Sequence, residues 1–240
     1  MHILLLSALL LGSSCAKPSD AGMARAMVAI PDAILPMGCE PSRDPSCAQT
    51  ELPRHAVQVR RFRIDRTEVS QDAYRACVEA RSCTRPFAAF EPRQNPNRPV
   101  TQVSWDQARR FCGWLGKRLP TEAEWELAAR GTDGRIYPWG DDPPTCQRAH
   151  TSDCGAAPAE VGQRPAGKSP FGVLDLAGNV DEWVQDLYVA YGAGTPGAPS
   201  GQRVARGGAY DAWHSRSTAR SALDPDYHDA LLGFRCAANE

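Results

Sequence analysis

The sequence predicts a single exported domain in which a few short strands and helices are joined by long irregular segments and held by disulfides. Its 240 residues are a length typical of one domain. Glycine and proline number 20 each, and both residues interrupt helices and strands. Nine cysteines occur in a chain that begins with an apolar segment, which indicates an oxidising compartment.

Composition excludes two classes of function. The 27 basic and 28 acidic residues give a formal net charge of −1, whereas a nucleic-acid-binding domain normally carries a basic face. After the N-terminal segment, no stretch is long and apolar enough to span a bilayer. We therefore expect no nucleic-acid partner, and contact with a membrane only through a lipid anchor.

The N-terminal segment is typical of an export signal. Residues 3–11 form a short apolar run, residues 12–14 are small, and Cys15 follows. This order favours a bacterial lipoprotein signal, in which Cys15 would be lipidated and held on the periplasmic or cell-surface side of a membrane. An ordinary secretory signal is the alternative, because no Lys or Arg precedes the apolar run and Leu11 stands one place further from Cys15 than usual. The predicted parts are a signal peptide, a flexible tether and one domain, over residues 1–15, 16–33 and 34–240.

Eight cysteines remain after Cys15, and an even number in an exported protein indicates four disulfides. Three pairs are close in sequence and lie in turn-rich stretches. They are Cys39 with Cys47, Cys77 with Cys83, and Cys146 with Cys154, and the remaining two are Cys112 and Cys236. Eight cysteines allow about 105 connectivities, so the pairing stays open at this point. A metal cluster is the alternative, but the chain has no C-x-x-C motif and its histidines are scattered.

Periodicity predicts a strand and then a helix at the start of the domain. From His55 to Asp65 apolar and polar residues alternate, with one slip, which is a strand pattern. Ser70 can cap a helix that follows it. The apolar face of that helix would carry Ala73, Tyr74, Cys77 and Val78.

Two capping boxes mark two further helices. In a capping box, two residues three apart each accept a hydrogen bond from the backbone N–H of the other. Two pairs have this spacing, namely Ser104 with Gln107 and Thr121 with Glu124. Both helices are expected to stop at the glycine that follows them, and the first turns Cys112 toward the core. Frequent prolines beyond the second helix predict turns and short strands.

Seven phrases of the sequence form a recognisable series. In chain order they are Arg63-Ile-Asp-Arg-Thr-Glu-Val-Ser, Pro99-Val-Thr-Gln-Val-Ser-Trp, Gly116-Lys-Arg-Leu-Pro-Thr-Glu-Ala-Glu-Trp-Glu, Tyr137-Pro-Trp-Gly, Ala177-Gly-Asn-Val-Asp-Glu-Trp, Arg206-Gly-Gly-Ala-Tyr and Gly233-Phe-Arg-Cys-Ala. Together they resemble the formylglycine-generating enzyme (sulfatase-modifying factor) family, from about Ile34 to the end of the sequence. The resemblance implies a single α+β domain with little regular structure, related to the C-type lectin-like fold.

The resemblance also bears on the disulfides. Family members carry a disulfide between the cysteines that correspond to Cys112 and Cys236. A second family disulfide would need cysteines near Ala129 and Ser217, and both are absent. The three local pairs would then be additional to the family pattern.

The resemblance further implies that the reactive centre of the family is missing. Active members oxidise a cysteine of a sulfatase to formylglycine with oxygen and copper, and two thiolates hold the Cu(I). The first of these cysteines corresponds to Ala212, and no cysteine occurs from Gly155 to Arg235. We therefore expect no copper site and favour a chain that is not an enzyme.

A different metal site is the enzymatic alternative. His214 and His228, with a carboxylate such as Asp211 or Asp226, have the ligand types of a non-haem iron site. Two histidines without a fixed spacing are a weak metal signal. The plainer interpretation is a surface that lines a former substrate groove.

The stretch that begins at Asp175 resembles the calcium-binding turn of the family. The resemblance implies side-chain oxygens from Asp175 and Glu182 and backbone carbonyl oxygens from Gly178 and Val180. Such a set suits Ca²⁺, a hard cation, which would here be structural. The alternative is a turn held by Asx-type hydrogen bonds alone.

Two functions from different classes follow. The first is a non-catalytic lipoprotein, a pseudoenzyme, that binds a protein or peptide partner. Its contact surface would be the segment between the Gly-Gly and Gly-Phe-Arg phrases, which offers the anchoring residue types Tyr210, Trp213, His214 and Tyr227. The plainer alternative for some of these residues is a place in the core. The second function is an oxidoreductase of the same family that acts on protein cysteine or uses a different metal site.

Overall fold

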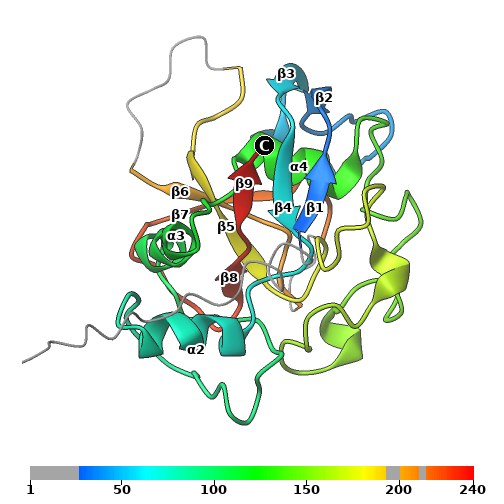
Figure 1. Ribbon diagram of the computed structural model, residues 1–240. Coiled ribbons are helices and arrows are strands. Elements are labelled where there is room, and N and C mark those ends of the chain that lie inside the picture. Colours follow the sequence, from blue (N-terminus) through cyan, green and yellow to red (C-terminus); the bar gives the residue numbers. More distant parts are fainter. Residues whose placement is uncertain (1–26, 193–200, 211–214) are drawn as a thin grey trace, which may run out of the picture.

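The computed structural model describes residues 27–192, 201–210 and 215–240 (Figure 1). Within these residues the chain forms three α-helices and nine strands, and the strands are arranged in three sheets. None of the described helices is long and apolar enough to cross a bilayer.

The first sheet joins the start of the described chain to its end (Figure 1). It consists of β1 (Met27–Ile30), β4 (Phe62–Asp65) and β9 (Ala237–Asn239), all antiparallel. The tether was predicted over residues 16–33, but β1 lies within this range. The folded domain therefore begins earlier in the sequence than predicted. A strand of only four residues is too short to show an alternating pattern, and its partner β4 is far away in the sequence.

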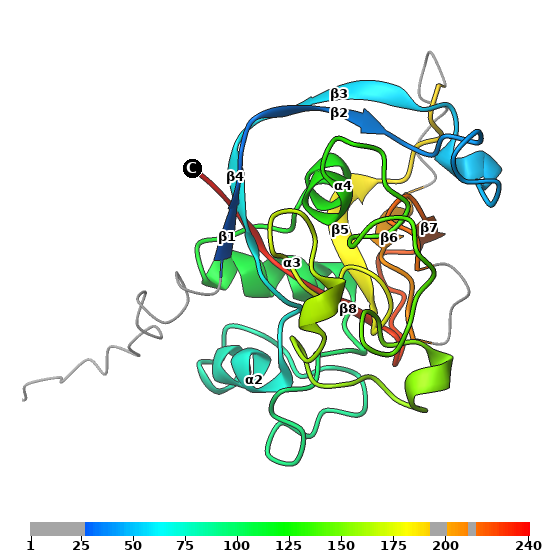
Figure 2. The same cartoon turned by 90° about the vertical axis from the view of Figure 1, so that its right-hand side faces the viewer.

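The second sheet is a ribbon of two strands that arches over helix α4 (Figure 2). Strand β2 (Ala33–Met37) pairs with β3 (His55–Val59), and α4 spans Glu122–Arg130. The single strand predicted from His55 to Asp65 is therefore two strands, and the slip in its pattern is the break between β3 and β4. The outer face of the ribbon leaves Ile34 64% exposed.

The third sheet forms the centre of the molecule. Its strand order is β7–β6–β5–β8, and β8 runs parallel to β5 while the other pairs are antiparallel. The strands span Arg220–Leu223 (β7), Arg203–Arg206 (β6), Asp181–Leu187 (β5) and Leu232–Phe234 (β8).

Two apolar clusters pack on opposite faces of this sheet. Trp183 of β5 and Ala205 of β6 belong to the cluster under α2 (Gln71–Glu79) and α3 (Trp105–Trp114). The next residues along, Val184 and Val204, belong instead to the cluster around α4. Successive side chains of a strand point to opposite faces of the sheet, so the same strands supply both cores. Burial of each large apolar side chain stabilises the fold by about 1.5–3 kcal/mol.

The three helices begin where their caps predicted. The Ser70 hydroxyl accepts a hydrogen bond from the Ala73 N–H at the start of α2. Both capping boxes, at Ser104 and at Thr121, are formed in both directions. Gly131 ends α4 with a positive φ of 64°, a conformation that glycine adopts without strain.

All eight cysteines after Cys15 lie in disulfides, which confirms the four predicted disulfides, and the structure decides the pairing that the sequence left open. The bonds join Cys39 to Cys47, Cys77 to Cys83, Cys112 to Cys236, and Cys146 to Cys154. The third of these connects α3 to the chain between β8 and β9 across 124 residues, and both of its cysteines are fully buried. Four disulfides indicate an exported, non-cytosolic protein.

Buried ion pairs connect α4 to the central sheet. The guanidinium of Arg206 donates to Glu122 at 2.9 Å and to Glu126 at 2.6 Å, and all three side chains are almost inaccessible. Arg235, the residue that follows β8, donates twice to Glu182 of β5 at 2.6 and 2.7 Å. Removing one partner of such a pair would leave an uncompensated buried charge, which typically costs about 3–5 kcal/mol.

Candidate functional site

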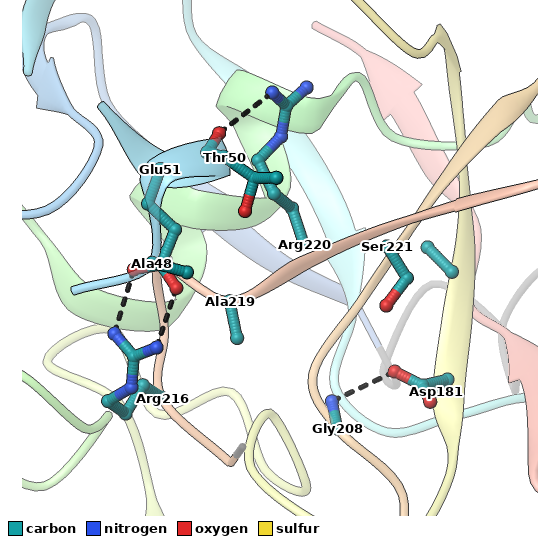
Figure 3. A pocket seen from close by; sticks show the side chains of 10 residues that line it. Ala48, Thr50, Glu51, Asp181, Gly208, Arg216, Ala219, Arg220 and Ser221 are labelled. Atoms are coloured by element: carbon teal, nitrogen blue, oxygen red, sulfur yellow. Dashed lines mark hydrogen bonds and ion pairs between the residues drawn. The ribbon is translucent and has the colours of Figure 1, made fainter. Parts of the chain in front are cut away.

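A cavity of about 250 Å³ opens beside the Gly207–Gly208 turn that follows β6 (Figure 3). It lies between the outer part of the central sheet and the disulfide-closed segment near the N-terminus. The residues that line it are Ala48, Thr50, Glu51, Asp181, Ala205, Gly208, Arg216, Ala219, Arg220 and Ser221.

Arg216 forms one wall of this cavity. Its guanidinium donates to both carboxylate oxygens of Glu51, at 2.6 and 2.7 Å, and to Asp44 at 2.9 Å. The Thr218 hydroxyl donates to Glu51 at 2.7 Å. A short 3₁₀ turn, Gln49–Glu51, holds Glu51 in place after the Cys39–Cys47 disulfide has closed the preceding loop. The wall is therefore rigid and its charges are paired.

Arg220 forms a second wall. Its guanidinium makes two hydrogen bonds to Glu122 at the start of α4, at 2.8 and 2.9 Å. It also donates to the carbonyl oxygens of Thr50 and Val189, and lies 4.0 Å from the centre of the Tyr191 ring. With both arginines fixed in this way, neither is free to move onto a ligand as a mobile cation would.

The open side of the cavity carries Asp181 and Ser221. Figure 3 places both across the cavity from Arg216. One Asp181 oxygen accepts a hydrogen bond from the Gly208 N–H at 3.0 Å, while Ser221 is exposed on β7. These are the polar groups that an incoming segment would meet.

The cavity offers no thiol. All cysteines among the described residues are paired in disulfides, and none lies in the sequence between Gly155 and Arg235. Three donors from His, Cys, Asp or Glu lie within 4.8 Å of one another at just one place in the described chain, namely Cys39, Asp44 and Cys47. Both of these sulfurs are in the disulfide, so this group does not offer thiolates to a metal.

Of the four residues predicted to form a contact surface, the structure describes Tyr210 and Tyr227. Tyr210 is half-buried, and its hydroxyl donates to the Ala156 carbonyl at 2.9 Å. Tyr227 is 44% exposed, and its hydroxyl bonds Asp229. Trp213 and His214 lie outside the described residues, as do Asp211 and Ala212.

The non-haem iron alternative depended partly on His228. Its imidazole ring stacks on Phe87, with ring centroids 3.7 Å apart, and its Nδ1 lies 3.0 Å from the Asp226 carbonyl oxygen. The described part of the chain therefore places His228 on an exposed aromatic surface rather than among carboxylate ligands.

The predicted calcium turn has an unusual backbone and an excess of negative charge. Asp175 and Asn179 adopt positive φ angles of 57° and 64°. A Cβ on Gly178 would lie 2.3 Å from the His150 carbonyl oxygen, so this position needs glycine. Glu68 adds a third carboxylate near Asp175 and Glu182, and Arg235 is the guanidinium that pairs with this group.

The charge excess is visible in Glu68 itself. This side chain is 2% exposed; its Oε1 accepts a hydrogen bond from Asn179 at 2.8 Å, and its Oε2 has no partner in the described chain. Burial and the nearby Asp175 carboxylate raise the pKa of Glu68 well above its usual value. A divalent cation would relieve both the charge and the missing contact.

The donor types at the turn fit Ca²⁺. Both oxygens of Glu182 already accept hydrogen bonds, from Arg235 and Trp125. Oε2 of Glu182 already has two donors, whereas Oε1 has one and can take a second partner. Asp175 uses one oxygen for the Gly162 N–H. Because the three carboxylates do not converge within 4.8 Å, the predicted carbonyl ligands, Gly178 and Val180, would have to complete the set.

The sequence analysis did not single out Glu51, Arg216 or Arg220. Arg216 and Arg220 stand four residues apart in the segment that resembles the reactive region of the family, and this spacing was the available signal. Glu51 carried none, because its burial depends on a partner 165 residues away. Glu68 was missed for the same reason.

The chain is similar to known proteins over nearly its whole length. A family model described as "Sulfatase-modifying factor enzyme 1-like domain" matches residues 13–240. The formylglycine-generating enzyme of Streptomyces coelicolor is 40% identical over 174 residues, which cover 59% of this chain and 53% of that protein. Inactive C-alpha-formylglycine-generating enzyme 2 of Bos taurus is 39% identical over 160 residues, which cover 58% of this chain and 50% of that protein. These matches span about half the length of each relative.

The solved structure of PvdO from Pseudomonas aeruginosa has the same architecture. The TM-score is 0.77 at 27% identity, and the match covers 89% of this chain and 94% of that chain. The similarity confirms the predicted single α+β domain.

Proposed function

Because the chain belongs to the family of sulfatase-modifying factor enzymes, we propose that it is a non-catalytic member that binds a protein or peptide partner at the cavity beside β6 and β7. The observation that carries this proposal is the lack of any cysteine from Gly155 to Arg235, the stretch in which the family resemblance puts the two copper-binding thiolates. Every cysteine of the described chain is in a disulfide. A relative that is itself named inactive supports a non-catalytic role.

The groups around the cavity suit binding better than oxidation. Cu(I) prefers soft thiolate ligands, whereas this cavity presents guanidinium, carboxylate and hydroxyl groups. The paired Arg216 and Arg220 make a wall of fixed shape, and a preorganised wall reduces the entropy lost on binding.

The edge of the central sheet favours an extended peptide as the partner. β7 is the outermost strand on its side of the sheet, and Ser221 projects from it into the cavity. An extended segment can hydrogen-bond to such an edge and place alternate side chains in adjacent hollows. Asp181 and Ser221 would meet the side chain that enters.

A bulky side chain that fills the cavity should weaken the binding of peptides to it. Peptides are selected from a displayed random library on the wild-type protein, and their affinities are then measured for Ser221→Trp. The bulky ring is expected to weaken cavity-directed peptides more than tenfold, about 1.4 kcal/mol or more. Gln58→Trp, on the exposed face of β3, is the matched control. Peptides that bind both variants as well as the wild type would contradict the proposed site.

Absence of catalysis is tested with a peptide that carries the sequence Cys-x-Pro-x-Arg. The protein is incubated with this peptide, Cu(I) and oxygen, and the peptide mass is measured beside a reaction with an active formylglycine-generating enzyme. We expect the cysteine to stay unchanged. Conversion to formylglycine would overturn the non-catalytic proposal.

A structural Ca²⁺ at the turn of Asp175, Gly178, Val180 and Glu182 is part of the proposal. A ligand at a hundred times its Kd stabilises a fold by about 2.7 kcal/mol, so EGTA should lower the melting temperature by about 5 °C or more. Asp175→Ala should remove this difference, whereas Asp106→Ala, an exposed residue on α3, should retain it. Equal melting temperatures of the wild type in Ca²⁺ and in EGTA would reject the site.

Membrane anchoring through Cys15 completes the proposal. The short apolar run, the small residues and the cysteine that follows support a lipoprotein signal over residues 1–15. Cys15→Ala should move the protein from the membrane fraction to the soluble fraction of the expressing cells. An unchanged distribution would leave an ordinary secretory signal.

A further inference from the structure

We propose that Phe87, Tyr227 and His228 form an aromatic shelf that binds a segment of the partner carrying lysine or arginine. This inference rests on the proposed binding function and specifies the chemistry of the partner. The shelf joins the predicted contact residue Tyr227 to Phe87, which comes from a different part of the sequence.

The shelf is an exposed aromatic surface. The rings of Phe87 and His228 are stacked, with centroids 3.7 Å apart and planes 15° from parallel. Phe87 is 59% exposed and Tyr227 is 44% exposed, and together they make up half of the four exposed large hydrophobic residues in the described chain. Large aromatic side chains of this kind are usually covered, and two exposed ones on loops that hydrogen-bond through Gln102 indicate a contact surface.

The backbone holds the shelf in place. The N–H of Phe87 donates to the Gln102 carbonyl at 3.0 Å, and the N–H of Gln102 donates to the Asp229 carbonyl at 2.8 Å. Gln102 and Ala89 both adopt positive φ angles, 58° and 49°, which are costly for residues other than glycine. Such conformations persist where the surroundings enforce them, so three separate loops act here as one preorganised unit.

The charges around the shelf favour a cation. Asp224 and Asp226 are exposed carboxylates in the same turn as Tyr227, and neither forms an ion pair within the described chain. The third acid of this turn, Asp229, is occupied by the Tyr227 hydroxyl and the Leu231 N–H. An ammonium or guanidinium group placed on the shelf would meet aromatic faces and two unpaired carboxylates together.

The probe is a fluorescein-labelled octapeptide with arginine at alternate positions and threonine between, compared with its glutamate counterpart. Binding to the signal-free protein is followed by fluorescence anisotropy at low and physiological salt. We expect the arginine peptide to bind, more tightly at low salt, and the glutamate peptide not to bind.

Two variants of Phe87 distinguish a contribution of the aromatic ring to binding from a contribution of apolar surface area alone. Phe87→Ala and Phe87→Leu are both expected to weaken binding of the arginine peptide about three- to fivefold, because leucine retains apolar area but has no aromatic face. Asp226→Asn should weaken it about twofold and reduce the salt dependence. Ile34→Ala removes a hydrophobic side chain that is 64% exposed elsewhere and should leave binding unchanged.

Three outcomes would overturn the shelf. In the first, Phe87→Ala binds the arginine peptide as tightly as Ile34→Ala does. In the second, the glutamate peptide binds as tightly as the arginine peptide. In the third, a neutral glycan such as maltoheptaose displaces the arginine peptide. Library peptides that lose affinity for Ser221→Trp but not for Phe87→Ala would leave the cavity as the binding site and reject the shelf alone. If neither Ser221→Trp nor Phe87→Ala weakens peptide binding, the proposed binding function itself would be rejected.

Discussion

The structure depends on arginines that are buried against carboxylates between its layers. Arg206 connects β6 to Glu122 and Glu126 of α4, and Arg220 of β7 shares Glu122 with it. Arg216 extends the same layer to Glu51 in the N-terminal loop. Buried charges are expensive unless they are paired and hydrogen-bonded, so each pair fixes the position of the elements that supply it. Helix α4, the edge of the central sheet and the loop closed by Cys39–Cys47 are thereby held as one unit.

Two of these arginines, Arg216 and Arg220, lie in the segment that resembles the reactive region of the family, from which the reactive cysteines are missing. The segment 215–221 contains no cysteine, and its backbone is held instead by the Arg206 guanidinium, which donates to the Ser217 carbonyl at 2.7 Å. The Ser217 hydroxyl is buried and has no hydrogen-bond partner in the described chain, near a position that the resemblance relates to a family disulfide. Arginine and glutamate thus provide the cross-connection that a covalent bond would otherwise give. The result is a wall of paired charges whose side chains are held in place.

The candidate surfaces differ in how they are made. The two arginines that line the cavity are already paired with carboxylates, so in the proposed binding its selectivity would rest on shape and on Asp181 and Ser221. The proposed aromatic shelf lies in the same turn as two exposed carboxylates that form no ion pair in the described chain, so its selectivity would rest on charge. The calcium turn serves neither surface directly. It would stabilise the irregular chain that carries them, which short strands and three helices alone support weakly.

The sequence by itself determined the local features of this protein. Capping residues at Ser70, Ser104 and Thr121 set the helix starts, because a cap acts on backbone groups two or three residues away. The ordered phrases identified the family, and the cysteine positions indicated both the disulfides and the missing reactive pair. The tertiary structure alone decided that β1 belongs to the domain, that Glu51 meets Arg216 and that Phe87 meets His228. Such contacts join residues far apart in the chain, and their partners are set by how the sheets pack, which no local spacing encodes.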